Sequence, residues 1–117
     1  MYRFLVLPAL SAALLLAGVA PLAQAAEQAY VKILSPANGA KLDAMAQNKI
    51  TYEVQPGPRG DHVHVYVDDK EVGILRQLKG SYTLETLSPG NHDVCIKVVN
   101  KAHVPIGVER CIKVSLD

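Results

Sequence analysis

The chain has 117 residues, with 12 Lys and Arg against 11 Asp and Glu, two Cys, no Trp and an apolar half. This length suits one compact domain and is too short for two. The nearly balanced charge argues against a strongly basic nucleic-acid binder and against an acidic solvating tail.

The N-terminal segment differs in composition from the rest of the chain. Arg3 is its only charged residue, and a long apolar run follows. After that run, Ala23 and Ala25 occupy the A-x-A positions that signal peptidase requires. An uncleaved anchor helix is the alternative, but Pro and Gly residues interrupt the run. We therefore expect residues 1–25 to be a cleaved signal peptide, and residues 26–117 to be a periplasmic or secreted domain without a membrane span.

The exported part of the sequence alternates apolar and polar residues, and clusters of Pro, Gly and Asn separate the alternating runs. A period of two is typical of strands that are half buried in a sheet. Strands are expected at residues 30–34, 49–54, 62–67, 71–75, 81–87, 93–99 and 108–116. This pattern predicts a single all-β domain, an Ig-like antiparallel β-sandwich of about seven strands.

The apolar residues on one face of each expected strand form the predicted core. They are Val31, Ile33, Ile50, Tyr52, Val63, Val65, Val67, Leu84, Val94, Ile96, Val98, Ile112, Val114 and Leu116. A core of this size makes a small domain only marginally stable without further support.

The two cysteines can supply that support, since they allow a single intramolecular pair. If residues 93–99 and 108–116 form a hairpin that turns near His103, the numbers of facing residues add up to about 206. Cys95 and Cys111 meet this condition and are out of phase with the core residues. We therefore predict a cross-strand disulfide on the outward face, in keeping with an oxidising compartment. A redox pair is the alternative, but the C-x-x-C spacing of such pairs is missing.

Three of the four histidines are expected at one end of the sandwich. His62 and His64 are two residues apart on a strand, so their side chains point to the same face. In an Ig-like order this strand runs antiparallel beside residues 92–100, which brings the following loop and His103 to the same end. Three imidazoles would suit copper(II) or zinc(II), with one position left open. The alternative is a polar solvent face with His103 at the tip of a mobile loop.

The fourth histidine, His92, starts the penultimate strand at the opposite end. It follows the sequence Leu87-Ser88-Pro89-Gly90-Asn91. We expect a structural corner in which the His92 side chain hydrogen-bonds back across this turn.

No catalytic residues are predicted. The sequence shows no serine in a nucleophile elbow and no unpaired cysteine set beside a histidine. Asp68, Asp69 and Glu71 lack the spacing of a calcium loop, and we expect them in a solvated hairpin turn.

The segment Ser35-Pro36-Ala37-Asn38-Gly39-Ala40-Lys41-Leu42, with the later turn Leu87-Ser88-Pro89-Gly90-Asn91-His92, resembles small exported bacterial Ig-like or fibronectin-III-like β-sandwich domains. The chain is similar to a subset of periplasmic proteins of unestablished activity with an H-x-H strand, a P-G-x-H turn and a further His. The matching positions here are His62, His64, His92 and His103. The resemblance covers most of the exported part and implies this fold, but no catalysis.

The opening S-P-x-x-G-x-x-L also resembles that of periplasmic copper-resistance carriers with a β-sandwich fold. Those carriers typically use a His at their mature N-terminus, where this chain would have Ala26 or Glu27.

Two functions are compatible with these features. The first is an exported, non-enzymatic binding or accessory module that holds a metal ion, copper or zinc, through His62, His64 and His103. The second is a metal-free module that presents an exposed strand or the 55–61 loop to a protein or glycan of the cell envelope. A small hydrolase is a third interpretation, but no nucleophile–base pair supports it.

Overall fold

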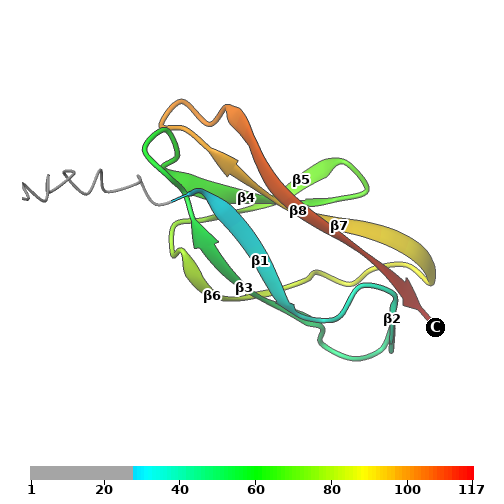
Figure 1. Cartoon of the computed structure of the whole chain (residues 1–117). Helices are drawn as coiled ribbons and strands as arrows, with labels where there is room; N and C mark the ends of the chain where they lie inside the picture. The colour runs from blue at the N-terminus through cyan, green and yellow to red at the C-terminus, as the bar shows by residue number, and fades with distance from the viewer. Residues whose placement is uncertain (1–27) are drawn as a thin grey trace, which may run out of the picture.

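The computed structural model describes residues 28–117, which form eight β-strands (Figure 1). The strands are β1 (Tyr30–Ser35), β2 (Ala40–Leu42), β3 (Lys49–Gln55), β4 (His62–Val67), β5 (Lys70–Leu75), β6 (Lys79–Thr83), β7 (Gly90–Val99) and β8 (Pro105–Leu116). The predicted signal peptide lies outside the described residues. Within those residues no helix has the length and hydrophobicity of a membrane span.

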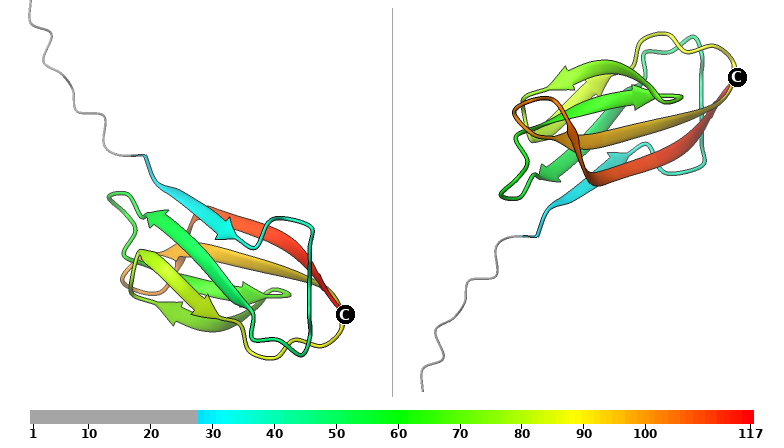
Figure 2. Two further views of the ribbon diagram at one scale, coloured as in Figure 1. Left: turned by 90° about the horizontal axis from the view of Figure 1, so that it is seen from below. Right: turned by 90° about the horizontal axis from the view of Figure 1, so that it is seen from above.

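The strands form two sheets that pack face to face, and Figure 2 shows the two layers from below and from above. One sheet has the order β1-β3-β6, and the other has the order β2-β8-β7-β4-β5. All pairs are antiparallel except the short parallel pair of β2 and β8. The predicted all-β Ig-like sandwich is confirmed.

The core lies between the sheets and contains the predicted residues. Each of them is buried except Ile33, which is partly buried and packs against the others. Val54 continues the inward row of Ile50 and Tyr52 on β3 and joins the core as well.

Two strands differ most from the prediction, one in its C-terminal end and one in its existence. The strand expected at 81–87 ends at Thr83, because its partner β3 begins at Lys49, which faces Thr83. Beyond this pair the Leu84 N–H still donates to the Asn48 carbonyl at 2.8 Å, but β3 offers no further partner. Strand β2 is missing from the prediction because three residues are too short to show alternation.

The predicted disulfide is confirmed. Cys95 and Cys111 are bonded and face each other in the β7–β8 hairpin. The Cys111 side chain is exposed, whereas Cys95 is buried because β7 is flanked by β4 and β8. The expected register holds as far as Lys97 opposite Glu109, and a shift follows before Val99 pairs with Pro105. The hairpin loop is therefore the segment 100–104.

Candidate metal centre

Strand β4 places two histidines on the outer face of the five-stranded sheet. As predicted, β4 runs antiparallel beside β7, with His62 opposite Val99. His62 and His64 are nevertheless almost fully buried, with 1% and 3% of their surface exposed. The expectation of a polar solvent face is therefore wrong. The loop after β7 folds back over this face and sets the His103 ring 4.6 Å and 5.2 Å, centroid to centroid, from those of His62 and His64.

The 100–104 loop is held in this position by Asn100. The Asn100 side-chain oxygen accepts hydrogen bonds from the backbone N–H groups of Ala102, at 2.9 Å, and Val104, at 3.1 Å. The His103 N–H donates to the Asn100 carbonyl at 2.9 Å. His103 itself has a φ of 63°, a left-handed conformation in which His is more common than most residues. These bonds form an ordered turn where a mobile tip was the alternative.

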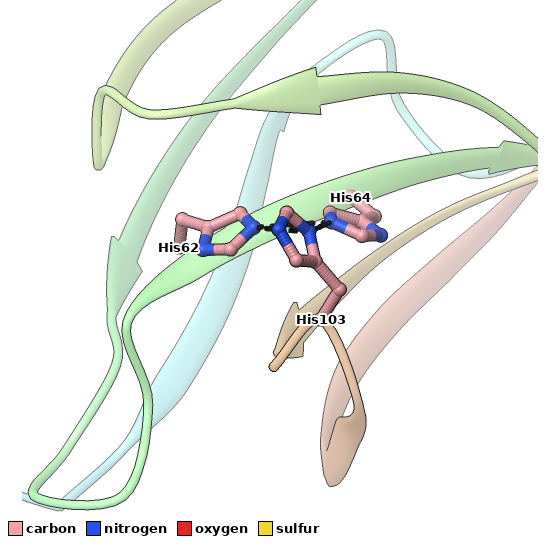
Figure 3. A group of neighbouring side chains, drawn as sticks. All are labelled: His62, His64 and His103. Atoms are coloured by element: carbon pink, nitrogen blue, oxygen red, sulfur yellow. Dashed lines mark hydrogen bonds between the residues drawn. The ribbon is translucent and has the colours of Figure 1, made fainter. Parts of the chain in front are cut away.

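Three ring nitrogens meet at the centre of the cluster (Figure 3). Nε2 of His62, Nε2 of His64 and Nδ1 of His103 lie 3.1 Å from one another in all three pairs. The three rings are tilted or edge-on to one another rather than stacked. The structure thus brings together the histidines that the sequence placed at one end.

Two carboxylates bind the outer nitrogens of the strand histidines. Nδ1 of His62 lies 2.8 Å from Oδ2 of Asp61, and Nδ1 of His64 lies 2.7 Å from Oε1 of Glu71. A carboxylate only accepts hydrogen bonds, so each Nδ1 carries the hydrogen and donates it. In the neutral rings this leaves a lone pair on each Nε2, directed at the centre. Glu71 is exposed, as the sequence predicted, but it lies on β5 beside the hairpin turn and also binds His64.

Burial and hydrogen bonding set the charges of these groups. Burial lowers the pKa of His64, which keeps its ring neutral at neutral pH. The hydrogen bond from His62 lowers the pKa of Asp61 and keeps its carboxyl ionised. The arrangement therefore favours a neutral His64 ring and an ionised Asp61 carboxylate.

When all three rings are neutral, this arrangement does not give every central nitrogen a hydrogen-bond partner. With both strand tautomers fixed, the centre holds at most one hydrogen, on Nδ1 of a neutral His103. The Nε2 atoms of His62 and His64 then face each other at 3.1 Å with two lone pairs and no hydrogen. A cation bound by all three nitrogens would remove this repulsion.

Sequence reasoning missed both carboxylates. Asp61 directly precedes His62, so its position beside the first histidine was visible in the sequence. The position of Glu71 beside His64 was not visible in the sequence, because Glu71 faces Tyr66 and reaches His64 only across a register shift in the β4–β5 pair. No sequence pattern predicts that shift.

The shift is a bulge at Val72, and the opposite sheet supports it. The Tyr82 hydroxyl of β6 donates a 3.0 Å hydrogen bond to the Val72 carbonyl. The next residue, Gly73, lies under the Tyr82 ring, and a Cβ there would be 2.7 Å from the tyrosine oxygen. Tyr82 and Gly73 therefore fix the backbone that presents Glu71 to His64.

His92 lies apart from the cluster and has different partners. Its Nδ1 lies 2.5 Å from Oδ2 of Asp68, and its Nε2 lies 2.7 Å from the Ser88 carbonyl and 3.4 Å from the Ser88 hydroxyl. Ser88, His92 and Asp68 thus have the order of a hydrolytic triad. However, Nε2 donates its hydrogen to the Ser88 carbonyl, so it has no lone pair with which to accept the hydroxyl proton. The side chain ties the β6–β7 connection to the β4–β5 turn, as a corner residue does.

Cys95, Glu109 and Cys111 form a second group with ligand-like spacing. Because the two sulfur atoms are bonded to each other, neither is a thiolate ligand in this state.

No family model and no curated protein sequence matches the chain. Several solved structures are similar to the chain. The fibronectin(III)-like modules of Clostridium thermocellum CbhA match with a TM-score of 0.58 and 19% identity, over 74% of this chain and 95% of that one. A lytic polysaccharide monooxygenase of Jonesia denitrificans matches with a TM-score of 0.50 and 15% identity, over 71% of this chain and 61% of that one. An engineered protein matches with a TM-score of 0.54 and 22% identity, over 77% of this chain and 20% of that one.

These similarities show a fibronectin-III-like β-sandwich. The Cys95–Cys111 disulfide is consistent with an oxidising compartment.

Proposed function

We propose that the protein is an exported, non-enzymatic module that binds one divalent transition-metal ion through His62, His64 and His103. The observation that carries this proposal is the convergence of three ring nitrogens, 3.1 Å apart, on one point. Two of these nitrogens belong to rings whose outer N–H groups donate to carboxylates, an arrangement found around most metal-bound histidines.

The spacing of the nitrogens fits a metal ion. The centre of such a triangle lies about 1.8 Å from each nitrogen, whereas a zinc–nitrogen bond is about 2.0–2.1 Å long. An ion with bonds of this length would lie about 1 Å out of the plane, with N–metal–N angles of about 98°. These angles fall between those of octahedral and tetrahedral sites, so the rings need little movement to bind.

The donor set favours Zn(II) or Cu(II). Imidazole nitrogen suits both ions, and three protein ligands leave a position for water or an external ligand. Within residues 28–117 no soft sulfur donor belongs to the histidine cluster. The two cysteines of the chain are bonded to each other, and Met45 is exposed in the β2–β3 connection.

Export and the lack of catalysis belong to the same proposal. The segment 1–25 has the features of a cleaved signal peptide, and the disulfide suits an oxidising compartment. The donated Nε2 hydrogen of His92 argues against hydrolysis by Ser88. We propose a periplasmic or secreted location, in which the module carries or presents its metal.

The proposal is tested by titrating the oxidised, metal-free protein with Zn(II) and with Cu(II) in a calorimeter. We expect one ion per chain and a dissociation constant in the micromolar range or below. His103→Ala removes a ligand from an exposed loop and should weaken binding without disturbing the core. The double variant His62→Ala/His64→Ala should abolish binding.

His92→Gln is the matched control, since it removes a histidine outside the cluster and should bind as the wild type does. Wild-type protein that takes up no ion would overturn the proposal. Equal binding by wild type and His103→Ala would overturn the assignment of the site.

The metal-free interaction module is favoured by a different observation. Ile74 and Val104 are exposed large apolar side chains, and each adjoins the cluster, Ile74 opposite His64 and Val104 next to His103. Failure of metal binding would favour a protein partner at this apolar edge.

A further inference from the structure

The charges of the two carboxylates behind the histidines bear on which metal ions the site binds. It rests on the proposed function, since it concerns the same site. Asp61 and Glu71 come from different segments, the end of the β3–β4 loop and β5, yet each binds the outer nitrogen of one strand histidine. Their own positions are fixed by the backbone.

Asp61 is held by its neighbours on both sides. Its N–H donates to the Val99 carbonyl at 2.8 Å, and a Cβ at the preceding Gly60 would lie 2.3 Å from the Pro56 carbonyl oxygen. Glu71 is held by the bulge that Tyr82 supports. The backbone is therefore fixed at both carboxylates, whose side chains are 31% exposed for Asp61 and 46% exposed for Glu71.

The net charge of the three histidines and two carboxylates matches that of a divalent ion. Three neutral imidazoles contribute no charge and the two carboxylates contribute two negative charges, so a divalent ion makes the assembly neutral. A monovalent ion leaves one negative charge over. Because His62 and His64 are buried, an uncompensated charge at this position is costly.

Two exposed cations near the site, Lys101 and Arg76, act on Asp61. Nη1 of Arg76 lies 3.8 Å from Oδ2 of Asp61, but the Arg76 side chain is 69% exposed. An ion pair so open to water is largely screened. The ionised carboxylates therefore act mainly on the ion that the histidines hold.

We infer that Asp61 and Glu71 make the cluster selective for divalent over monovalent ions, so that it holds Zn(II) or Cu(II) and disfavours Cu(I). The two residues do not touch the ion; they act through the rings of His62 and His64 as positioning residues. A site of this kind keeps copper in its oxidised form.

Zn(II) and Cu(I) are suitable probes of this selectivity. Both have a filled d shell and no geometric preference from d electrons, and they differ by one unit of charge. Dissociation constants for both ions are measured by competition with chelators, under anaerobic conditions for Cu(I), at one fixed pH. The measured quantity is the ratio of the two constants in each variant.

Asp61→Asn and Glu71→Gln remove a charge but keep an oxygen that accepts the Nδ1 hydrogen. Each should weaken Zn(II) binding by about 10–100-fold, the usual effect of losing an outer-shell partner. Cu(I) binding should weaken by roughly the square root of that factor, because the ion has half the charge. The Zn(II) preference over Cu(I) should therefore fall by about 3–10-fold per variant.

Glu53→Gln is the control. Glu53 lies on β3 in the other sheet, where it pairs with Lys32 and Lys79, so its variant should keep the wild-type ratio. An unchanged ratio in both Asp61→Asn and Glu71→Gln would overturn the inference while leaving the three-histidine site intact. A wild type that binds neither ion would instead overturn the proposed function itself.

Discussion

Glu71 reaches His64 across a bulge, with Oε1 of the glutamate 2.7 Å from Nδ1 of the histidine. In a regular hairpin the residue opposite His64 would be Gly73, since Tyr66 faces Glu71 and Val67 faces Lys70. The extra residue, Val72, shifts the pairing so that Ile74 faces His64 instead. Bulges of this kind commonly redirect side chains near functional sites.

Gly73→Ala is expected to destabilise this bulge. The new Cβ would lie 2.7 Å from the Tyr82 oxygen, so the ring must move and its bond to the Val72 carbonyl is strained. We expect a loss of about 1–3 kcal/mol in the free energy of unfolding, as for other overpacked sites. Zn(II) affinity should also fall, because Glu71 is displaced from His64. Urea denaturation and Zn(II) titration measure the two effects.

Gly80→Ala is the control for this substitution. A Cβ at Gly80 would meet the flexible Gln77 side chain at 3.2 Å, so its unfolding free energy should change by less than about 1 kcal/mol. A Gly73→Ala protein as stable as Gly80→Ala would contradict the role of the close contact.

Much of the fold could be predicted because alternation and register are local properties of the sequence. The rows of Val63 and Val65 on β4 and of Val94 and Ile96 on β7 fix which faces are buried. The pairing of Cys95 with the second cysteine follows from the same register.

The surroundings of the site could not be predicted in this way. The burial of His64 depends on a loop whose shape comes from the side-chain hydrogen bonds of Asn100. The carboxylate behind His64 depends on a bulge held by Tyr82 from the other sheet. The first is a local side-chain-to-backbone contact and the second is a contact between the two sheets, and a period of two encodes neither. The role of the three histidines as ligands stays a prediction.

Asn100→Ala tests whether the loop is organised before an ion binds. Loss of the side-chain oxygen removes acceptors for the N–H groups of Ala102 and Val104. His103 must then be ordered when the ion binds, so we expect Zn(II) affinity to fall although every ligand remains. The lost bonds correspond to about 1–2 kcal/mol, or roughly a tenfold weaker binding constant.

Asn100→Asp keeps the acceptor oxygen and should bind Zn(II) within a few-fold of the wild type. Amide hydrogen exchange at Ala102 and Val104 provides an independent measurement, since both amides should lose protection in the alanine variant alone. Unchanged exchange in Asn100→Ala would contradict the proposed support of the loop.

The disulfide is expected to stabilise the fold without taking part in metal binding. Cys95 and Cys111 are separated by 16 residues, and closing a loop of this length stabilises a protein by about 3 kcal/mol in the chain-entropy model. We expect the variant Cys95→Ala/Cys111→Ser to lose about this much in urea denaturation. If it still folds, it should bind Zn(II) as the wild type does. Loss of the site in a folded variant would show that the bridge supports the cluster.

Export predicts a defined N-terminus. We expect the protein recovered from the exported fraction to begin at Ala26, because Ala23 and Ala25 supply the small side chains that signal peptidase requires. Intact-mass measurement detects this cleavage directly. Ala25→Leu should block cleavage and retain the full-length chain on the membrane. Recovery of full-length wild-type protein after secretion would contradict the signal-peptide interpretation.

His92 and Asp68 should make the stability depend on pH. The hydrogen bond to Asp68 raises the pKa of His92, and the backbone N–H of Asp93 lowers the pKa of Asp68, with His92 adding to the effect. The contribution of His92 is complete below its unfolded pKa of about 6.5 and is lost as pH rises through the raised folded value. The contribution of Asp68 is complete above its unfolded pKa of about 3.9 and is lost as pH falls through the lowered folded value. The pair therefore stabilises the fold most between about pH 4 and 6.5.

In urea denaturation with a chelator present, His92→Gln should lose more stability at about pH 5.5 than at about pH 9. Equal losses at both values would mean that the His92 corner acts through packing and not through its charge.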